Sequence, residues 1–436
     1  MLKVVKFGGS SLADANQFRK VADIIRSEPC RRYVVASAPG KRSKDDEKVT
    51  DMLFACYNRV KDGEGVNDVF EKIEQRYQGI IDELGLHIDM QPDFDNIKSA
   101  ILSYAGRDYV ASRGEYLNSK ILAAYLGFDF IDAEKGIYFD ESGRLDADRT
   151  DAVLSAILSE HEYAVVPGFY GSMPNGTIKT FSRGGSDITG SIVARAANAD
   201  IYENWTDVSG MLMVDPRCVS DPEPIDFITY RELRELSYMG ATVMHEEAIF
   251  PVRVSGIPIN IRNTNDPSAP GTMIVPQTDR PAKHTITGIA GKKGFSAISI
   301  EKDMLKAREG FCRKTLEVLE DNDIRFEHIP SGIDTMTFVV PTAQIADKKD
   351  AVTSAIIKTV APDIITINDE LALIAVVGRG MVRTQGTAVK VFKALADRDI
   401  NVRMIDQGSS EINIIVGIDE KDYENALDAI YREFVK

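Results

Sequence analysis

Over roughly the first 280 residues, short apolar runs alternate with stretches in which apolar residues recur at helical spacing. Residues 2–6 form such a run, and after Asp14 the positions of Phe18, Val21 and Ile24 mark one face of a helix. Further apolar runs lie at 34–36, 128–131, 163–166 and 201–203. Short strands separated by helices predict an α/β fold with a mostly parallel sheet covered on both faces, in which ligands bind at the carboxyl ends of the strands.

Two segments depart from this alternation. Residues 66–105 have helical spacing with a polar face, and we expect them to form an insertion at the rim of the sheet. Prolines at positions 267, 270, 276 and 281 punctuate the stretch that ends at His284. Because such a stretch interrupts regular structure, we place a domain boundary there.

The last 150 residues contain an internal repeat. A shift of 76 positions aligns Gly310 with Gly386 and Lys314 with Lys390, and the match continues without a gap for about thirty residues. Two tandem βαββ units indicate a module that binds a small ligand or forms dimers, with a purely structural role as the alternative. The first copy is expected to have strands at 298–300, 324–329 and 336–340 and a helix at 314–320, and the second to have strands at 373–377, 400–405 and 412–416 and a helix at 389–396.

The composition limits the class of protein. The chain has 436 residues and a formal net charge of −15, which argues against non-specific binding to nucleic acid or to an anionic membrane. No apolar run approaches the roughly 18 residues of a membrane span, and the N-terminus has no signal-peptide pattern, so we expect a cytoplasmic enzyme of small metabolites. The four cysteines and five histidines form no ligand-spaced group, so we expect free thiols and no metal site built by the protein.

A glycine turn follows the first predicted strand. Lys6 ends the strand, and Phe7, Gly8 and Gly9 lead toward the helix that begins near Asp14. Glycines let backbone N–H groups approach an anion, a helix N-terminus favours negative charge, and the lysine points into the same crevice, so the pattern indicates a phosphate site. No Walker A sequence occurs in the chain, and a bare turn is the alternative.

A second glycine pair carries an arginine. Residues 181–187 read Phe-Ser-Arg-Gly-Gly-Ser-Asp and open a predicted helix at 188–197. The Arg183 guanidinium can bind a carboxylate through two hydrogen bonds, and Gly184 and Gly185 again admit an anion. Ser186 and Asp187 alone could be a helix cap, but a cap does not account for the arginine beside two glycines.

Three weaker patterns remain. Thr206 and Asp207 follow the strand at 201–203, and Arg217 follows soon after, a combination that suits a nucleotide. The Arg-Gly-Glu sequence that ends at Glu115 is expected at the head of a helix over 116–125, where the carboxylate could hold a substrate ammonium group or simply favour the helix dipole. The Gly-Arg-Gly at 378–380 lacks the third glycine of a dinucleotide fingerprint, so we treat it as a turn.

Taken together, the motifs at 6–11, 113–115, 183–187 and 205–208 resemble those of aspartate kinases in order and spacing, and the repeat resembles their paired C-terminal ACT domains. The resemblance covers essentially the whole chain. It implies a three-layer amino-acid kinase domain over 1–284, a first ACT domain over 285–365 and a second over 366–436. It also implies that a strand at 285–294 pairs into the second ACT domain.

The resemblance implies an ATP-dependent kinase that phosphorylates the β-carboxylate of L-aspartate, with Mg²⁺ carried by the nucleotide. Lys6 would stabilise the transferring phosphoryl group, and Asp187 would orient Lys6. ATP would contact Lys6, Phe7, Gly8, Gly9, Thr206, Asp207, Leu212, Arg217, Thr242 and Val243. Aspartate would contact Ser37, Thr50, Glu115, Arg183, Gly184, Gly185 and Ser186, with Arg183 on a carboxylate and Glu115 on the ammonium group.

One position departs from the family pattern. Many relatives have a lysine that approaches the nucleotide where this chain has Thr242, and a proline where it has Glu246. A lost phosphate-facing charge costs about 1–3 kcal/mol, so we expect weaker ATP binding that depends more on Lys6 and Arg217.

The ACT pair implies feedback inhibition, with lysine as the hypothetical effector, and a homodimer formed through the ACT sheets. The effector pocket is expected between the loop at 304–310 and the segment at 331–334, with Met304, Ser331, Gly332, Ile333 and Asp334 as its residues. Two other functions stay open: another amino-acid kinase, such as acetylglutamate or glutamate 5-kinase, and an amino-acid sensor whose kinase domain is inactive.

Overall fold

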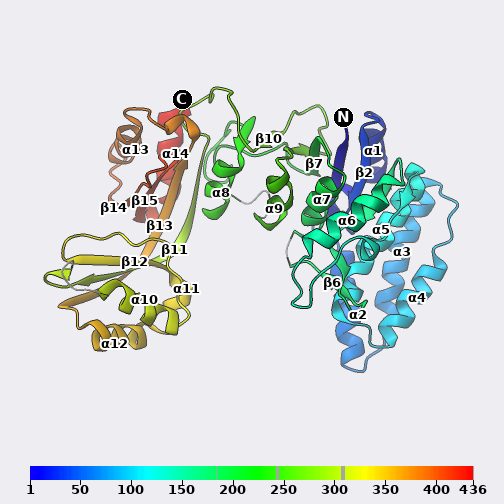
Figure 1. The fold of residues 1–436 in the computed structure, drawn as a ribbon, viewed down its shortest axis with the longest axis horizontal. Coiled ribbons are helices and arrows are strands. Elements are labelled where there is room, and N and C mark those ends of the chain that lie inside the picture. The colour runs from blue at the N-terminus through cyan, green and yellow to red at the C-terminus, as the bar shows by residue number, and fades with distance from the viewer. Residues whose placement is uncertain (183, 242–243, 245, 306–309, 436) are drawn as a thin grey trace. The chain divides into compact units, whose positions relative to one another are not determined.

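The computed structural model describes residues 1–182, 184–241, 244, 246–305 and 310–435. The chain divides into two compact units, each described by itself, and Figure 1 labels many elements of both. The boundary near residue 278 lies close to the one expected at 284, but two segments of the expected catalytic domain belong to the second unit. The first unit comprises Met1–Met211, Pro224–Tyr230 and Val243–Thr278; the second comprises Leu212–Glu223, Arg231–Thr242 and Asp279–Lys436.

The sheet of the first unit has eight strands in the order β3-β4-β2-β1-β7-β9-β10-β8. Neighbouring strands are parallel except β9 and β10, which confirms the mostly parallel sheet. A two-stranded ribbon of β5 and β6 accompanies it. The strands are β1 (Lys3–Phe7), β2 (Arg31–Ala36), β3 (Asp129–Phe130), β4 (Ala164–Pro167), β5 (Tyr170–Ser172), β6 (Ile178–Thr180), β7 (Ile201–Thr206), β8 (Phe227–Thr229), β9 (Ile259–Asn263) and β10 (Thr272–Val275).

Helices cover both faces of this sheet. One face carries α1 (Ala15–Arg26), α2 (Val49–Lys61), α3 (Asn67–Leu84), α4 (Gln91–Leu102) and α5 (Arg107–Leu126), whose apolar residues share one core with Val5, Phe7 and Trp205. The other face carries α7 (Gly185–Ala196), against which α6 (Ala147–Ser159) and α9 (Glu246–Ser255) pack. Residues 66–105 are helical as expected, but they are not a rim insertion, because Ile73, Tyr77, Phe94 and Ile97 are buried in that core.

Helix α5 begins at Arg107, so the expectation that Glu115 heads a helix is wrong. Glycine is unfavourable inside helices. Here the glycine allows close packing, since a Cβ at Gly114 would lie 2.9 Å from the Cβ of Ala38. Glu115 is therefore buried in the middle of a 20-residue helix.

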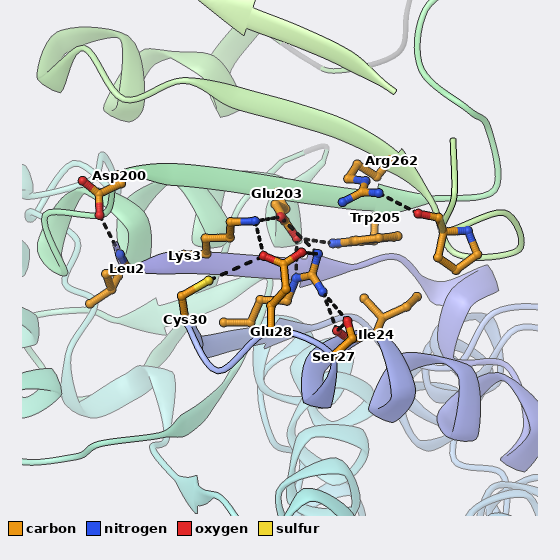
Figure 2. Close-up of polar contacts among 12 residues, drawn as sticks. Leu2, Lys3, Ile24, Ser27, Glu28, Cys30, Asp200, Glu203, Trp205 and Arg262 are labelled. Atoms are coloured by element: carbon orange, nitrogen blue, oxygen red, sulfur yellow. Dashed lines mark hydrogen bonds and ion pairs between the residues drawn. The ribbon is translucent and has the colours of Figure 1, made fainter. Parts of the chain in front are cut away.

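A buried ion cluster joins the amino-terminal halves of β1, β2 and β7 (Figure 2). Glu203 accepts hydrogen bonds from Lys3 Nζ at 2.9 Å, Arg31 Nε at 2.8 Å and Trp205 Nε1 at 2.9 Å. Glu28 also pairs with Lys3 and Arg31. Although burial alone would raise the pKa of the Glu203 carboxyl, the bonds from Arg31 and Lys3 lower it. The cluster fixes the register of three strands whose other ends carry the candidate site.

The second unit contains a five-stranded antiparallel sheet in the order β12-β11-β13-β15-β14. The long strands β11 and β13 serve both repeats: residues 288–292 of β11 pair with 373–377 of β13, and 295–301 pair with 364–371. Residues 324–329 form only one bridge, His328 to Val339, where a full strand was expected. The strands are β11 (Gly288–Glu301), β12 (Thr335–Pro341), β13 (Ile364–Val377), β14 (Val402–Asp406) and β15 (Asn413–Asp419).

The expected helices are present as α10 (Phe311–Asp321) in the first repeat and α13 (Thr387–Ala396) in the second. Each repeat also has a second helix that was not predicted, α12 (Lys349–Val360) in the first and α14 (Tyr423–Val435) in the second. The turn expected at 378–380 leads into a short 3-10 helix, Arg379–Met381. Among the described helices, none combines the length and apolar character needed to cross a membrane. The remaining helices are α8 (Tyr230–Tyr238), the short α11 (Thr342–Ile345) and the 3-10 turns Gly9–Leu12, Ala133–Lys135 and Glu420–Asp422.

Candidate active site

Lys6, Asn204 and Asp187 form a hydrogen-bonded triad near the carboxyl ends of β1 and β7. Lys6 Nζ lies 2.6 Å from Asp187 Oδ1 and donates to Asn204 Oδ1 at 3.4 Å, while Asn204 Nδ2 donates to Asp187 Oδ1 at 2.8 Å. Lys6 is 7% exposed, and Asn204 lies beside it in the sheet register. The triad holds a single ammonium group at a fixed point, which suits the stabilisation of a developing negative charge.

The expected pairing of Lys6 with Asp187 is present, but Asn204 was missed by the sequence reasoning. Its signal was a polar residue inside a buried strand, two positions before Thr206. Buried amides are held by hydrogen bonds, and this one bonds both charged partners of the triad.

The glycine turn differs from the expected phosphate loop in two respects. The Gly8 N–H donates to the Trp205 carbonyl at 3.1 Å, so the expectation that this N–H faces a phosphate is wrong for this structure. The turn leads into the 3-10 helix Gly9–Leu12, and the N-terminus of α1 is capped by Asp14, whose side chain accepts from the Gln17 N–H.

The same turn touches the loop after β2 along the backbone. Gly40 N–H donates to the Gly9 carbonyl at 2.8 Å. A Cβ at Gly9 would lie 2.9 Å from the Ala38 carbonyl oxygen, and one at Gly40 would lie 2.6 Å from the Gly9 carbonyl carbon. Glycine is therefore required at both positions, and the two loops are held as one surface.

The second glycine motif packs against the loop after β4. Arg183 lies outside the described residues, while Gly184 (φ 61°) precedes α7, which begins at Gly185 and includes Ser186 and Asp187. A Cβ at Gly185 would lie 2.4 Å from the Phe169 ring. Phe169 itself has a left-handed backbone, φ 82°, which is uncommon for a residue with a side chain.

A pocket of about 740 Å³ opens beside this motif. Phe169 and Ser182 line it together with Phe181, Lys179 and Glu247, and Ser182 Oγ donates to Glu247 at 3.2 Å. Neither Lys6 nor Glu115 lines the pocket. Sequence reasoning missed Phe169, although its place after a predicted strand was a usable signal.

Glu115 and Ser37 meet on the other face of the sheet. The Ala38 N–H lies close enough to the Glu115 carboxyl to lower its pKa, whereas Oε2 of this carboxyl is enclosed and has no partner within the described residues. Burial raises the pKa of this carboxyl to about 8, against the opposing effect of the Ala38 N–H. A buried carboxyl whose Oε2 is enclosed and unpartnered fits the expected ammonium acceptor. Thr50 lies half-buried in the first turn of α2, and no hydrogen bond links it to this group.

The expected nucleotide residues are divided between the units. Thr206 and Asp207 belong to the first unit, where Thr206 Oγ1 donates to Asp207 at 3.2 Å. Leu212 and Arg217 belong to the second unit, and the exposed Arg217 side chain is bonded to Asp215. Thr242 and Val243 lie outside the described residues, so the structure gives no contact for either.

Part of the expected effector segment is held together in the second unit. The Met304 N–H donates to Asp334 Oδ1 at 3.0 Å, and the Lys302 N–H donates to the Asp334 carbonyl at 2.8 Å. Ser331 forms a bridge to Met336, and the Gly332 N–H donates to the Thr335 carbonyl. The side chains of Met304 and Ile333 are 71% and 72% exposed, so they are free to contact a ligand. Residues 306–309 of the expected loop are not described.

Comparison with known proteins agrees with this arrangement. The profile of the amino acid kinase family matches residues 1–263, and that of an ACT domain matches residues 374–434. Aspartokinase 3 of Bacillus subtilis is 39% identical over 454 aligned positions, which cover 99% of this chain and 98% of that protein.

Solved structures show the same fold. The crystal structure of Clostridium acetobutylicum aspartate kinase, described as an allosteric enzyme, is 52% identical with a TM-score of 0.92 and 99% coverage of both chains. Escherichia coli aspartokinase III in complex with aspartate and ADP is 24% identical with a TM-score of 0.75 and 99% coverage of both chains, which is a similarity of fold.

Proposed function

The chain belongs to the aspartate kinase family, and from this we propose that it transfers the γ-phosphoryl group of ATP to the β-carboxylate of L-aspartate. The product is 4-phospho-L-aspartate, the first intermediate on the way to lysine, threonine and methionine. The observation that supports the proposal most directly is the triad of Lys6, Asn204 and Asp187 at the carboxyl ends of β1 and β7.

In this reaction an oxygen of the β-carboxylate forms a bond to the γ-phosphorus, and the bond from that phosphorus to the oxygen bridging to the β-phosphate breaks. ADP leaves with the electron pair. The attacking carboxylate is ionised at neutral pH, so no general base is needed. Lys6 stabilises the charge on the transferring group, and Asp187 and Asn204 hold its ammonium in place.

Mg²⁺ enters the proposal with the nucleotide. Among the described residues, no group of three or more histidine, cysteine or carboxylate side chains is placed to hold a metal ion. Asp187, the carboxylate nearest to Lys6, is already bonded to Lys6 and Asn204. When bound, the ion would neutralise phosphate charge, while the protein residues position the two substrates.

The amino-acid substrate is assigned to the residues around the loop after β2. Glu115 accepts the ammonium group, Ser37 donates a hydroxyl, and Thr50 lines the same side. Arg183, with Gly184, Gly185 and Ser186, receives a carboxylate. On the nucleotide side, Thr206 and Asp207 of the first unit are assigned together with Phe7 and Gly9; the Gly8 N–H is engaged by Trp205, which leaves Gly9 as the N–H donor of the turn.

Regulation is assigned to the second unit. We propose that lysine binds near Met304 and Asp334 and inhibits the kinase, and that the chain forms a homodimer through its ACT sheets. The proposal is supported by the ACT profile match and by the bond from the Met304 N–H to Asp334, which brings both expected segments together. Light scattering of the purified protein tests the dimer.

The decisive experiment couples ADP release to a spectroscopic readout with ATP, Mg²⁺ and L-aspartate, with and without millimolar lysine. Turnover that lysine suppresses supports the kinase and the effector together. Turnover that threonine alone suppresses refutes lysine as the effector. If aspartate supports no turnover while glutamate or acetylglutamate does, the substrate is wrong; if no amino acid does, the chain is an inactive sensor.

A further inference from the structure

Two side chains of α5 lie against one peptide unit in the loop after β2. Asn118 Nδ2 donates to the Ser37 carbonyl at 2.7 Å, and the Ala38 N–H lowers the pKa of the Glu115 carboxyl. Residues 115 and 118 are three positions apart, so they lie on the same face of the helix. The C=O of the Ser37–Ala38 peptide is thus fixed by Asn118, and Glu115 lies beside its N–H.

Backbone hydrogen bonds also fix the loop after β2 to the end of β1 and to the glycine turn. The Ser37 N–H donates to the Phe7 carbonyl at 3.1 Å, and the Gly40 N–H donates to the Gly9 carbonyl at 2.8 Å. Helix α5 comes close enough to hold the loop because position 114 has no Cβ. The chain of contacts therefore runs from α5 through residues 37–40 to the glycine turn.

Asn118 has no other role within the described structure. It is fully buried, and its Oδ1 is enclosed without a hydrogen-bond partner. A buried amide oxygen without a hydrogen bond lowers the stability of the folded protein. If the Asn118 side chain only filled space, an apolar residue at this position would therefore give a more stable protein. The bond to the Ser37 carbonyl is what an apolar residue could not supply.

We propose that Asn118 is a positioning residue of the aspartate site, which acts by holding the Ser37–Ala38 peptide and so placing the Ser37 hydroxyl and the Glu115 carboxylate for the substrate. This inference rests on the proposed function, because Ser37 and Glu115 are its aspartate-binding residues. Without the amide donor, the Ser37 carbonyl is left buried and unbonded, and the peptide can rotate away from its place.

The test is Asn118→Ala, assayed for the KM of aspartate, the KM of ATP, kcat and the melting temperature. We expect the KM of aspartate to rise about tenfold or more while the KM of ATP stays within about twofold, since one lost hydrogen bond to a positioned group is worth about a factor of ten. The matched control is Ser119→Ala, which removes an equally buried hydroxyl without a partner from the next position of the same helix and should leave both KM values unchanged.

A double-variant cycle separates positioning from general destabilisation. If Asn118 acts through Ser37, the combination of Asn118→Ala with Ser37→Ala should raise the KM of aspartate little beyond the larger single effect, because the hydroxyl to be placed is gone. Should Asn118→Ala not yield folded protein, the isosteric Asn118→Asp, which loses the amide donor when ionised, takes its place.

Three results would overturn the inference: a wild-type KM of aspartate in the Asn118 variant, equal rises in both KM values, or two effects that simply multiply in the double variant. The wild-type assay is read first. Without turnover of aspartate by the wild-type protein, the proposed function fails and the inference falls with it. With turnover, each of these results refutes the role of Asn118 alone.

Discussion

Replacing Glu115 by glutamine should change how the stability of the first unit depends on pH. The carboxyl is buried, and burial raises its pKa from 4.5 to about 8. In the unfolded chain it ionises near 4.5, so between these pH values the folded state holds a proton that the unfolded state has lost. The contribution of Glu115 to the free energy of unfolding is therefore fully present below pH 4.5 and is lost as the pH rises to about 8.

The size of the effect follows from the shift. Each pH unit between 4.5 and about 8 lowers the free energy of unfolding of the wild-type protein by up to about 1.4 kcal/mol. Glutamine has nearly the same shape and does not titrate, so Glu115→Gln lacks this slope. Relative to the wild type, the variant should gain stability steadily from pH 5 to pH 8.

Urea unfolding without aspartate measures the slope. Trp205 is the one tryptophan of the chain and is buried in the first unit, so its fluorescence follows that unit. The transition is recorded for both proteins at pH 5, 6, 7 and 8. Parallel dependence of the two proteins on pH would show that the Glu115 carboxyl is ionised in the folded protein, and would refute the reasoning.

The remaining predictions concern catalysis, buried charge and close packing. Lys6→Met should lower kcat about a thousandfold in the ADP-release assay while calorimetry still detects aspartate binding, because in the proposed function the lysine contacts the transferring phosphoryl group rather than the amino acid. Arg31→Met should lower the free energy of unfolding by about 3–5 kcal/mol in urea titrations at pH 7, because Glu203 stays buried with one cation fewer; a loss below 1 kcal/mol would contradict this. Gly185→Ala should raise the KM of aspartate, since its Cβ meets the Phe169 ring at 2.4 Å, and an unchanged KM would show that the ring gives way freely.

Much of the fold could be predicted because local pattern and tertiary structure agree. The apolar run at 2–6, the helix expected to begin near Asp14 and the repeat with a shift of 76 all correspond to observed elements. The strand expected at 324–329 forms only the bridge from His328 to Val339 on the free edge of β12, and Pro330, which has no N–H to donate, follows it directly. An apolar pattern predicts a strand but does not show how far its pairing can extend.

Residue type and position suggested Lys6 as a phosphate ligand, and the resemblance implied its pairing with Asp187, which the structure contains. Sequence reasoning missed residues whose roles depend on distant partners. Asn204 gains its role from Lys6, which is 198 positions away, and Asn118 gains its role from Ser37, which is 81 positions away. The glycine at position 114 also depends on a distant residue, because a Cβ there would lie too close to Ala38 on another element.

The buried ion cluster of Figure 2 also limits when the first strands can pair while the chain is being synthesised. Arg31 and its partner Glu203 are 172 positions apart, so a ribosome adding about 5–20 residues per second makes the acid roughly 9–34 s after the base. During that interval Lys3 and Arg31 lack the carboxylate on β7 that allows their burial between the strands. The nascent chain must therefore keep β1 and β2 open until β7 emerges, and fragments that end before residue 203 should remain unfolded.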